Sequence, residues 1–223
     1  QAVSRGLGDV YKRQLYLRTD LLEMLRSLRP GGNMSQRRMI AMLAVATLPV
    51  AIAGYVVNSL DPSLLTDLPT LAVANLVFAA LLWHADRSGA LVRQIGHMRF
   101  GSAIIIGFAQ CLALIPGASR SGVTMTAARY LGFERLAAAR FSLLLSIPAI
   151  AGAGLLKGAD IVAEGDVALG IDAALVCLLS FGFALAAIGW MMRWLARADF
   201  RIFVWYRIGL GIILLGAIAA GAI

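Results

Sequence analysis

Long apolar runs separated by short polar stretches dominate the pattern of this chain. The clearest runs are 39–58, 68–83, 101–115, 136–156, 167–192 and 202–223. Roughly 20 apolar residues in a helix cross the hydrocarbon core of a bilayer, and several of these runs are long enough. A transmembrane β-barrel would instead show alternating segments of about ten residues, and the chain has none. The pattern therefore predicts an all-α integral membrane protein, a polytopic helical bundle.

Composition supports this fold class. Hydrophobic residues make up 60% of the 223 and charged residues only 14%, well below the usual 25% or so of soluble domains. The net charge of +8 comes from 20 basic and 12 acidic residues, many of the basic ones in linkers between the apolar runs. We therefore expect anionic lipid headgroups as partners, and no nucleic acid. Cys111 and Cys177 lie in apolar runs, which predicts small buried thiols rather than a disulfide or a metal site.

The first residues differ from the rest of the chain. Residues 1–14, QAVSRGLGDVYKRQ, are polar and match neither a signal peptide nor a transit peptide. We interpret them as a non-native leader and expect the chain to be truncated at its N-terminus. Residues 15–38 are predicted to form a basic cytoplasmic connector, and residues 39–223 the membrane domain.

Positive charge in the linkers predicts the topology, because arginine and lysine concentrate in cytoplasmic loops. The linkers at 26–38, 87–99 and 193–201 each contain three or more arginines and are placed inside. The linkers at 61–67 and 157–166 are placed outside. Two apolar runs lie between residues 100 and 157, so two full crossings would end on the wrong side. We therefore expect about five spanning helices and one re-entrant segment near 125–156.

A polar, glycine-bearing stretch, LIPGASRSGVT at 114–124, lies between two of the apolar runs. Pro116 ends a helix, and Gly117 and Gly122 free the backbone. Ser119 or Ser121 can then cap a helix that runs toward Tyr130.

This stretch is suited to an anionic phosphate, because a helix N-terminus offers free amides and a positive dipole end. Arg120 would supply bidentate contacts, and Ser119, Ser121 and Thr124 would supply hydroxyl donors. The alternative is an ordinary loop whose arginine reaches the lipid headgroups. An ionisable residue at membrane depth favours the functional interpretation.

Residues 110–154, QCLALIPGASRSGVTMTAARYLGFERLAAARFSLLLSIPAIAGAG, resemble the second signature region of the bacterial undecaprenyl-diphosphate phosphatase family, known for bacitracin resistance. The late VWYRIGLGIILL resembles that family's last helix. The resemblance implies a multi-pass inner-membrane enzyme with two inverted repeats, each with a re-entrant hairpin. Such an enzyme hydrolyses undecaprenyl diphosphate to the monophosphate and recycles the lipid carrier for peptidoglycan.

The resemblance also implies roles for individual residues. Catalytic roles fall to Arg120, Ser119 and Ser121, in a site that faces the outer side of the membrane. Binding roles for the polyprenyl diphosphate fall to Gly117, Gly122, Thr124 and Gln110. A divalent cation, Mg²⁺ or Ca²⁺, is implied as cofactor, although no cluster of metal ligands is visible in the sequence. The oligomeric state, including a homodimer, stays open.

The chain departs from the family at its carboxylates. The family's first signature, with a glutamate pair and a histidine, is absent, and Gln110 and Leu114 occupy the positions of the glutamates in the second repeat. Hydrolysis needs a nucleophile and a base as well as a cation, so we expect weak diphosphate binding and little turnover. The alternatives are a lipid-phosphate transporter or flippase and a non-catalytic membrane subunit. Because His84 and His97 lie on or near an inner linker, a histidine-based lipid phosphatase is disfavoured.

Overall fold

The computed structural model describes residues 22–24, 26–27, 29, 31–60, 68–88, 92–164, 167–195 and 198–221. The predicted leader at 1–14 and the outer linker at 61–67 lie outside these residues, as does the side chain of Cys177. Within the described part the chain is helical and contains no strand, apart from one isolated bridge between Arg93 and Phe133. The all-α prediction is therefore confirmed.

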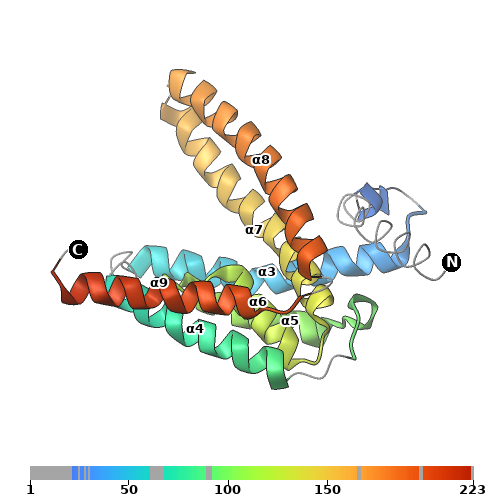
Figure 1. The fold of residues 1–223 in the computed structure, drawn as a ribbon. Coiled ribbons are helices and arrows are strands. Elements are labelled where there is room, and N and C mark those ends of the chain that lie inside the picture. Colours follow the sequence, from blue (N-terminus) through green and yellow to red (C-terminus); the bar gives the residue numbers. More distant parts are fainter. Residues whose placement is uncertain are drawn as a thin grey trace. The chain divides into compact units, whose positions relative to one another are not determined.

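Each predicted apolar run corresponds to one helix (Figure 1). The helices are α3 (Met34–Leu60), α4 (Leu68–Ser88), α5 (Phe100–Cys111), α6 (Arg120–Tyr130), α7 (Arg135–Glu164), α8 (Val167–Leu195) and α9 (Arg201–Ala219), with two short 3₁₀ turns, η2 (Ile95–His97) and η3 (Leu112–Leu114). Four segments of the described chain are long and apolar enough to cross a membrane: Met34–Val57, Leu68–Ser88, Arg135–Gly152 and Arg201–Ala219. The chain is thus a multi-pass membrane protein, and the count of about five spans stays a prediction.

The chain divides into two compact units. One consists of residues 1–37 and 147–197, and so contains α8 and the second half of α7. The other consists of residues 38–146 and 198–223, and it contains every residue of the predicted site. The site can therefore be described within this second unit alone.

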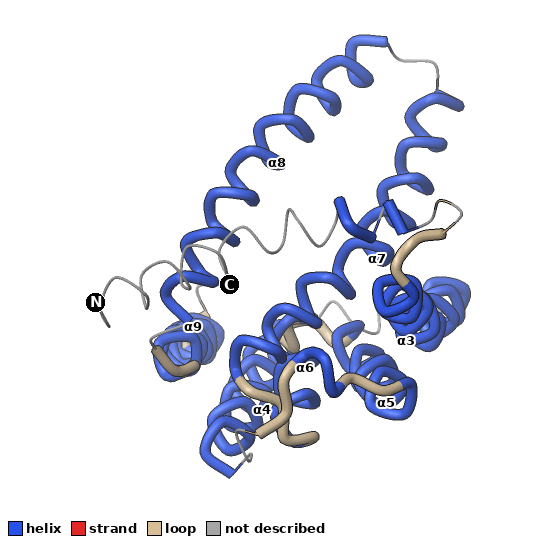
Figure 2. The backbone as a smooth tube through the Cα atoms, turned by 90° about the vertical axis from the view of Figure 1, so that its right-hand side faces the viewer, coloured by secondary structure: helices blue, strands red, loops and turns tan. Residues whose placement is uncertain are grey.

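In the second unit α4 packs against α6 and α9, and α5 packs against α6. Figure 2 shows α6 between α4 and α5. Small side chains on α4, including Ala72 and Ala79, are fully buried, which lets neighbouring helices approach closely. Ala74 and Phe78 of α4 form a core cluster with Ala118 and Val123. This cluster fixes the start of α6 against α4.

Helices α5 and α6 form a short hairpin. They contain 12 and 11 residues, about 18 Å and 16.5 Å at 1.5 Å per residue, which is less than the roughly 30 Å of a hydrocarbon core. The segments that flank the hairpin lie together, because the amide of Arg93 donates to Gly132 O at 3.1 Å and the amide of Glu134 donates to Arg93 O at 2.9 Å. The chain therefore enters and leaves the hairpin at the same end.

The re-entrant segment predicted near 125–156 stays a prediction, since no membrane is present. Within that range the described chain has one helix break, at residues 131–134. Helix α6 ends at Tyr130, and α7 runs continuously from Arg135 through Pro148 to Glu164. The short helices α5 and α6 lie in the second unit, and the predicted phosphate-binding stretch at 114–124 follows α5 and includes the start of α6.

Candidate functional site

The tip of the hairpin is a tight turn over residues 115–118. The amide of Ala118 donates to Ile115 O at 3.1 Å, Pro116 follows Ile115, and Gly117 has a φ of +85°. Proline at the second position and a positive φ at the third are typical of a type II turn, which explains the Pro-Gly pair. A side chain at Gly117 would also collide with Leu71 O of α4. Only glycine fits this position.

Ser119 begins α6 in an unusual backbone conformation. It is the N-cap residue and has a φ of 58°, and among the described residues no other non-glycine has a positive φ. Its Oγ accepts from the amide of Gly122 at 3.4 Å and lies 3.4 Å from the Oγ of Ser121. Strained backbone of this kind clusters at functional sites. The predicted helix cap at Ser119 is confirmed.

Arg120 is half-buried at the first position of α6, beside the two exposed serine side chains. Its Nη1 donates to Ser146 O of α7 at 3.4 Å. Burial lowers the pKa of the Arg120 guanidinium, which starts so far above neutrality that the group stays charged at pH 7. One long hydrogen bond leaves most of its five N–H donors available. Arg120 is therefore equipped to bind an anion at the start of α6.

Thr124 lies one turn further along α6 and is buried. Its Oγ1 donates to Arg120 O at 2.9 Å and lies 2.7 Å from the Oγ of Ser142 on α7. The hydroxyl pair joins α6 to α7 below the tip. The contact of Thr124 with a diphosphate stays a prediction, as do the roles of the other predicted site residues. The structure does bring Gly117, Ser119, Arg120, Ser121, Gly122 and Thr124 together at one helix start.

Arg207 is a site residue that the sequence analysis missed. It comes from the middle of α9 and is buried. Its Nη2 donates to Gly117 O at 2.6 Å and Ala118 O at 3.0 Å, and its Nε donates to Asn75 Oδ1 at 2.9 Å. The Asn75 amide in turn donates to Arg207 O at 2.6 Å. Arg207 therefore fixes the turn from the far end of the sequence, and a lone arginine inside the apolar run 202–223 was the signal for it.

Arg207 also explains why residue 122 is glycine. A Cβ on Gly122 would lie 2.6 Å from Nη1 of Arg207, closer than the two groups can approach. The guanidinium therefore lies against the first turn of α6. Its hydrogen-bonding partners at the turn are neutral oxygens, so its positive charge adds to that of the helix N-terminus.

Gln110 lies in the last turn of α5, just before η3, and only 1% of it is exposed. Neither its Oε1 nor its Nε2 has a hydrogen-bond partner in the described chain. Buried polar groups are nearly always hydrogen-bonded, so an exception calls for a physical reason. A ligand or a water molecule that binds the Gln110 amide would supply one.

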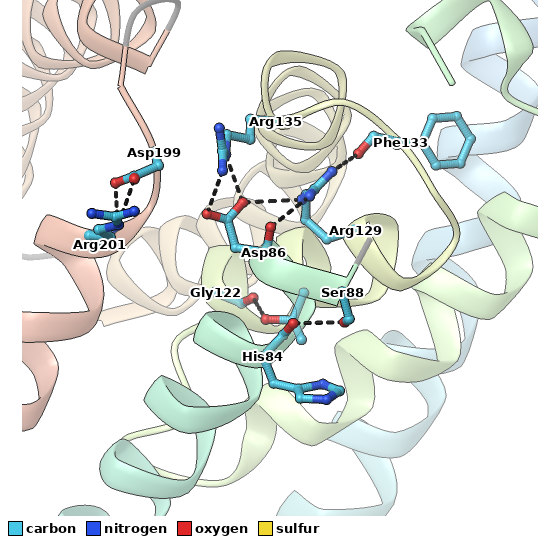
Figure 3. Close-up of polar contacts among 10 residues, drawn as sticks. His84, Asp86, Ser88, Gly122, Arg129, Phe133, Arg135, Asp199 and Arg201 are labelled. Atoms are coloured by element: carbon cyan, nitrogen blue, oxygen red, sulfur yellow. Dashed lines mark hydrogen bonds and ion pairs between the residues drawn. The ribbon is translucent and has the colours of Figure 1, made fainter. Parts of the chain in front are cut away.

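A second group of charges, also missed from the sequence, lies toward the other end of α6 (Figure 3). The carboxylate of Asp86 on α4 accepts hydrogen bonds from Nε and Nη2 of Arg135 at 2.8 and 3.0 Å. Nε of Arg129 lies 3.2 Å from the same carboxylate. Arg129 also donates to Phe133 O at 2.6 Å and Asp86 O at 3.0 Å. Asp86 lies just before the 87–99 linker, near the end of α4, and it is buried and joins α4, α6 and α7.

Three polar residues without a predicted role, His84, His97 and Glu134, lie at the base of the hairpin. Nδ1 of His84 lies 2.8 Å from the Tyr130 hydroxyl, and Nδ1 of His97 accepts from the amide of Gln94 at 3.1 Å. The carbonyl of Glu134 accepts from the amide of Ala138 at 2.8 Å, so Glu134 occupies a capping position before α7. No group of three or more His, Cys, Asp or Glu residues that could hold a metal occurs in the described chain.

Comparison with known proteins yields one family. The family model described as bacitracin resistance protein BacA matches residues 7–213, a range that includes part of the predicted leader. A protein of Gloeobacter violaceus, named undecaprenyl-diphosphatase, is 41% identical over 96% of this chain and 77% of its own length. Proteins of the same name from Roseobacter denitrificans and Ruegeria pomeroyi are 43% and 38% identical, over 78% and 90% of this chain and 65% and 75% of their own lengths.

Proposed function

This chain belongs to the bacitracin resistance protein BacA family, and from that premise we propose that it hydrolyses undecaprenyl diphosphate to undecaprenyl phosphate and phosphate. The product would re-enter peptidoglycan synthesis as lipid carrier. Support comes from relatives named undecaprenyl-diphosphatase at about 40% identity. These names favour hydrolysis over the transporter and over the non-catalytic subunit.

The observation that supports this function best is the start of α6. Ser119, Arg120 and Ser121 lie there beside first-turn amides, on a turn fixed by Arg207. In this proposal Arg120 binds the diphosphate and stabilises the charge that develops as the terminal phosphate leaves. Ser119 and Ser121 donate hydroxyl hydrogens to phosphate oxygens. The unpaired amide of Gln110 donates a further hydrogen bond.

Hydrolysis also needs a base that activates the attacking oxygen. Ser119 Oγ lies within hydrogen-bonding distance of Ser121 Oγ and of the Gly122 amide, and Arg120 donates to Ser146 O. In the part of the chain that the structure describes, these three side chains form no hydrogen bond with a carboxylate. Asp86 is engaged by Arg129 and Arg135 toward the far end of α6. We therefore propose that this chain alone binds diphosphate but releases phosphate slowly.

The described residues do not fit a divalent cation held by the protein. The donors around Ser119 are hydroxyls, an amide and carbonyls, next to the cationic Arg120 and Arg207, whereas Mg²⁺ and Ca²⁺ favour carboxylates. In our proposal a cation reaches this site only as a complex with the substrate's diphosphate. Titration calorimetry of the lipid-free chain with MgCl₂ and CaCl₂ is then expected to show no binding.

The orientation is also a proposal. Arginine-rich linkers at 87–99 and 193–201 favour the cytoplasmic side of a bacterial inner membrane. The tip of the α5–α6 hairpin points away from the 87–99 linker and is therefore placed toward the outer side. A substrate whose diphosphate lies at the outer face could then reach Arg120.

The test is equilibrium binding of undecaprenyl diphosphate to the purified chain in detergent, with phosphate release followed in parallel. Arg120→Ala is expected to weaken binding roughly 100-fold, because it removes a charged partner of the phosphate. Arg201→Ala is the matched control, since that arginine is exposed at the start of α9. Unchanged binding by Arg120→Ala would contradict the assignment. Lipid transport without phosphate release would favour the transporter.

A further inference from the structure

A basic pocket of about 520 Å³ lies at the base of the hairpin, separate from the tip. Arg38, Arg93, His97 and Arg99 line it together with Val92, Gly96 and Met98. None of its lining residues in the described chain is acidic, in contrast to the pocket of about 220 Å³ beside α9, where Asp86 and Asp199 neutralise Arg135 and Arg201. The basic pocket therefore has an uncompensated positive charge.

An aromatic ring lies near two of these arginines. The guanidinium of Arg93 lies 4.6 Å from the centroid of Phe133, and its Nη1 donates to Leu131 O at 2.9 Å. The guanidinium of Arg38 lies 5.9 Å from the centroid of Phe100. None of the three arginines forms an ion pair with a described residue. Stacking on Phe133 orients the Arg93 guanidinium, while its remaining N–H groups stay available to an anion.

The backbone at the pocket is also open to a ligand. Arg99 is the N-cap of α5 and makes no side-chain cap, so the first amides of α5 are not capped by it. No heavy atom lies within 4 Å of where a Cβ would be on Gly96 or Gly101. Because Nδ1 of His97 accepts a backbone hydrogen, the neutral ring has its proton on Nε2, a further donor. These groups match the oxygens of a phosphate.

An apolar stripe continues from the pocket along α5. Phe100, Ile104, Phe108 and Leu112 recur every four residues and are all exposed, so they lie on one gently winding face of the helix. Phe100 contacts Arg38 of the pocket. A cationic pocket that leads directly into exposed apolar surface matches a molecule with an anionic head and a hydrocarbon tail.

We infer that this pocket binds the phosphate-bearing headgroup of an anionic membrane phospholipid, whose acyl chain lies on the Phe100–Leu112 stripe. This lipid site is independent of the diphosphate site at the tip. It does not require turnover. It adds a specific lipid contact at the hairpin base, where the flanking segments 93 and 132–134 are hydrogen-bonded to each other.

The experiment titrates the purified chain in neutral detergent with dihexanoyl phosphatidylglycerol and counts bound lipid by native mass spectrometry. Dihexanoyl phosphatidylcholine is the uncharged comparison, and we expect it to bind about tenfold more weakly or worse. An arginine near a membrane surface contributes about fivefold in affinity. The Arg38→Ala/Arg99→Ala double variant should therefore bind phosphatidylglycerol roughly 25-fold more weakly, and Arg99→Glu alone should also weaken it. Arg201→Ala should bind like the unaltered chain.

Each opposite outcome would overturn the lipid site. Equal binding of the two lipids would show that the pocket does not distinguish an anionic from an uncharged headgroup. If Arg201→Ala weakened phosphatidylglycerol binding as much as the pocket variants do, the effect would be a general one of net charge. Complete displacement by sodium phosphate, at an ionic strength matched with sodium chloride, would assign the pocket to soluble phosphate. A melting temperature of Arg99→Ala equal to that of the unaltered chain shows that the variant is folded, because Arg99 is exposed. Undecaprenyl diphosphate binding at Arg120 should be unchanged in these variants.

Discussion

Arg207 connects the last helix to a turn nearly ninety residues earlier in the chain. Arg207→Met would leave the carbonyls of Gly117 and Ala118 and the Asn75 side chain without their donor, and each unpaired buried group costs about 1–3 kcal/mol. Arg207→Lys keeps the charge but loses the forked geometry. We therefore expect Arg207→Met to lower the melting temperature strongly. Arg207→Lys should weaken undecaprenyl diphosphate binding roughly 10- to 100-fold, because the turn moves.

The readouts are melting temperature in detergent and the dissociation constant for the diphosphate lipid. A purely structural arginine would lower both together in Arg207→Lys. A positioning arginine lowers affinity while the melting temperature stays within a few degrees of that of the unaltered chain. Wild-type affinity in Arg207→Lys would therefore show that its contacts with the turn do not position the site.

Gln110 allows a test in which stability and binding move in opposite directions. Gln110→Met keeps the length of the side chain and removes two polar atoms that have no partner in the described chain. An unpaired buried amide destabilises the fold. The free energy of unfolding of the variant should therefore be equal to that of the unaltered chain or higher by up to about 1 kcal/mol. Binding of undecaprenyl diphosphate should fall about tenfold, because one hydrogen bond to a charged oxygen is lost.

Chemical denaturation of the purified chain measures the first quantity and lipid titration the second. A Gln110→Met variant that is destabilised and binds normally would assign this residue to the protein core.

At the scale of elements, Asp86 is the joint between α4, α6 and α7. Side-chain exposure is 0% for Arg129 and 7% for Asp86, against 65% and 27% for the Arg201–Asp199 pair at the start of α9. Asp86→Asn leaves two guanidinium groups without their carboxylate, and breaking such a buried pair costs about 3–5 kcal/mol. Asp199→Asn should cost at most about 1 kcal/mol, as for other exposed pairs. The free energy of unfolding in detergent compares the two variants, and equal values would mean that Asp86 is not a structural joint.

The helices themselves followed from the sequence, because membrane helices are continuous apolar runs with polar breaks. The helix start at Ser119 was also predictable, since the serines and glycines around Arg120 are local signals. Arg207, Asn75 and the Asp86 group were not, because their partners lie up to 132 residues away and only folding brings them together. A single arginine within an apolar run indicates that the residue has a buried polar partner, but the sequence does not identify that partner. Pro148 lies inside α7, and the helix is continuous around it.

At the scale of the whole molecule, the count of crossings depends on the α5–α6 hairpin. Two apolar runs between the inner linker and the outer linker require one that does not cross. Neither α5 nor α6 is long enough to cross alone, and the flanking residues Arg93 and Glu134 are hydrogen-bonded to each other. If this hairpin enters and leaves the membrane on one side, we expect α7 to make the single crossing from the predicted inside to the predicted outside. This arrangement keeps the arginine-rich linkers on the cytoplasmic side and leaves α7 as one continuous helix.

We therefore expect single cysteines at Gln94 and Glu134 to react with a membrane-impermeant maleimide from the same side of the membrane. Each cysteine is introduced into a chain whose own cysteines are replaced by Cys111→Ser and Cys177→Ser. The maleimide is applied to intact spheroplasts and, separately, to inverted vesicles. Both positions should be labelled only in inverted vesicles, where the cytoplasmic face is outside. A cysteine at Ser59, near the end of α3, is the control and should be labelled only in spheroplasts. Labelling of Gln94 and Glu134 from opposite sides would mean that the α5–α6 segment crosses the membrane, and α7 would then have to be the segment that turns back.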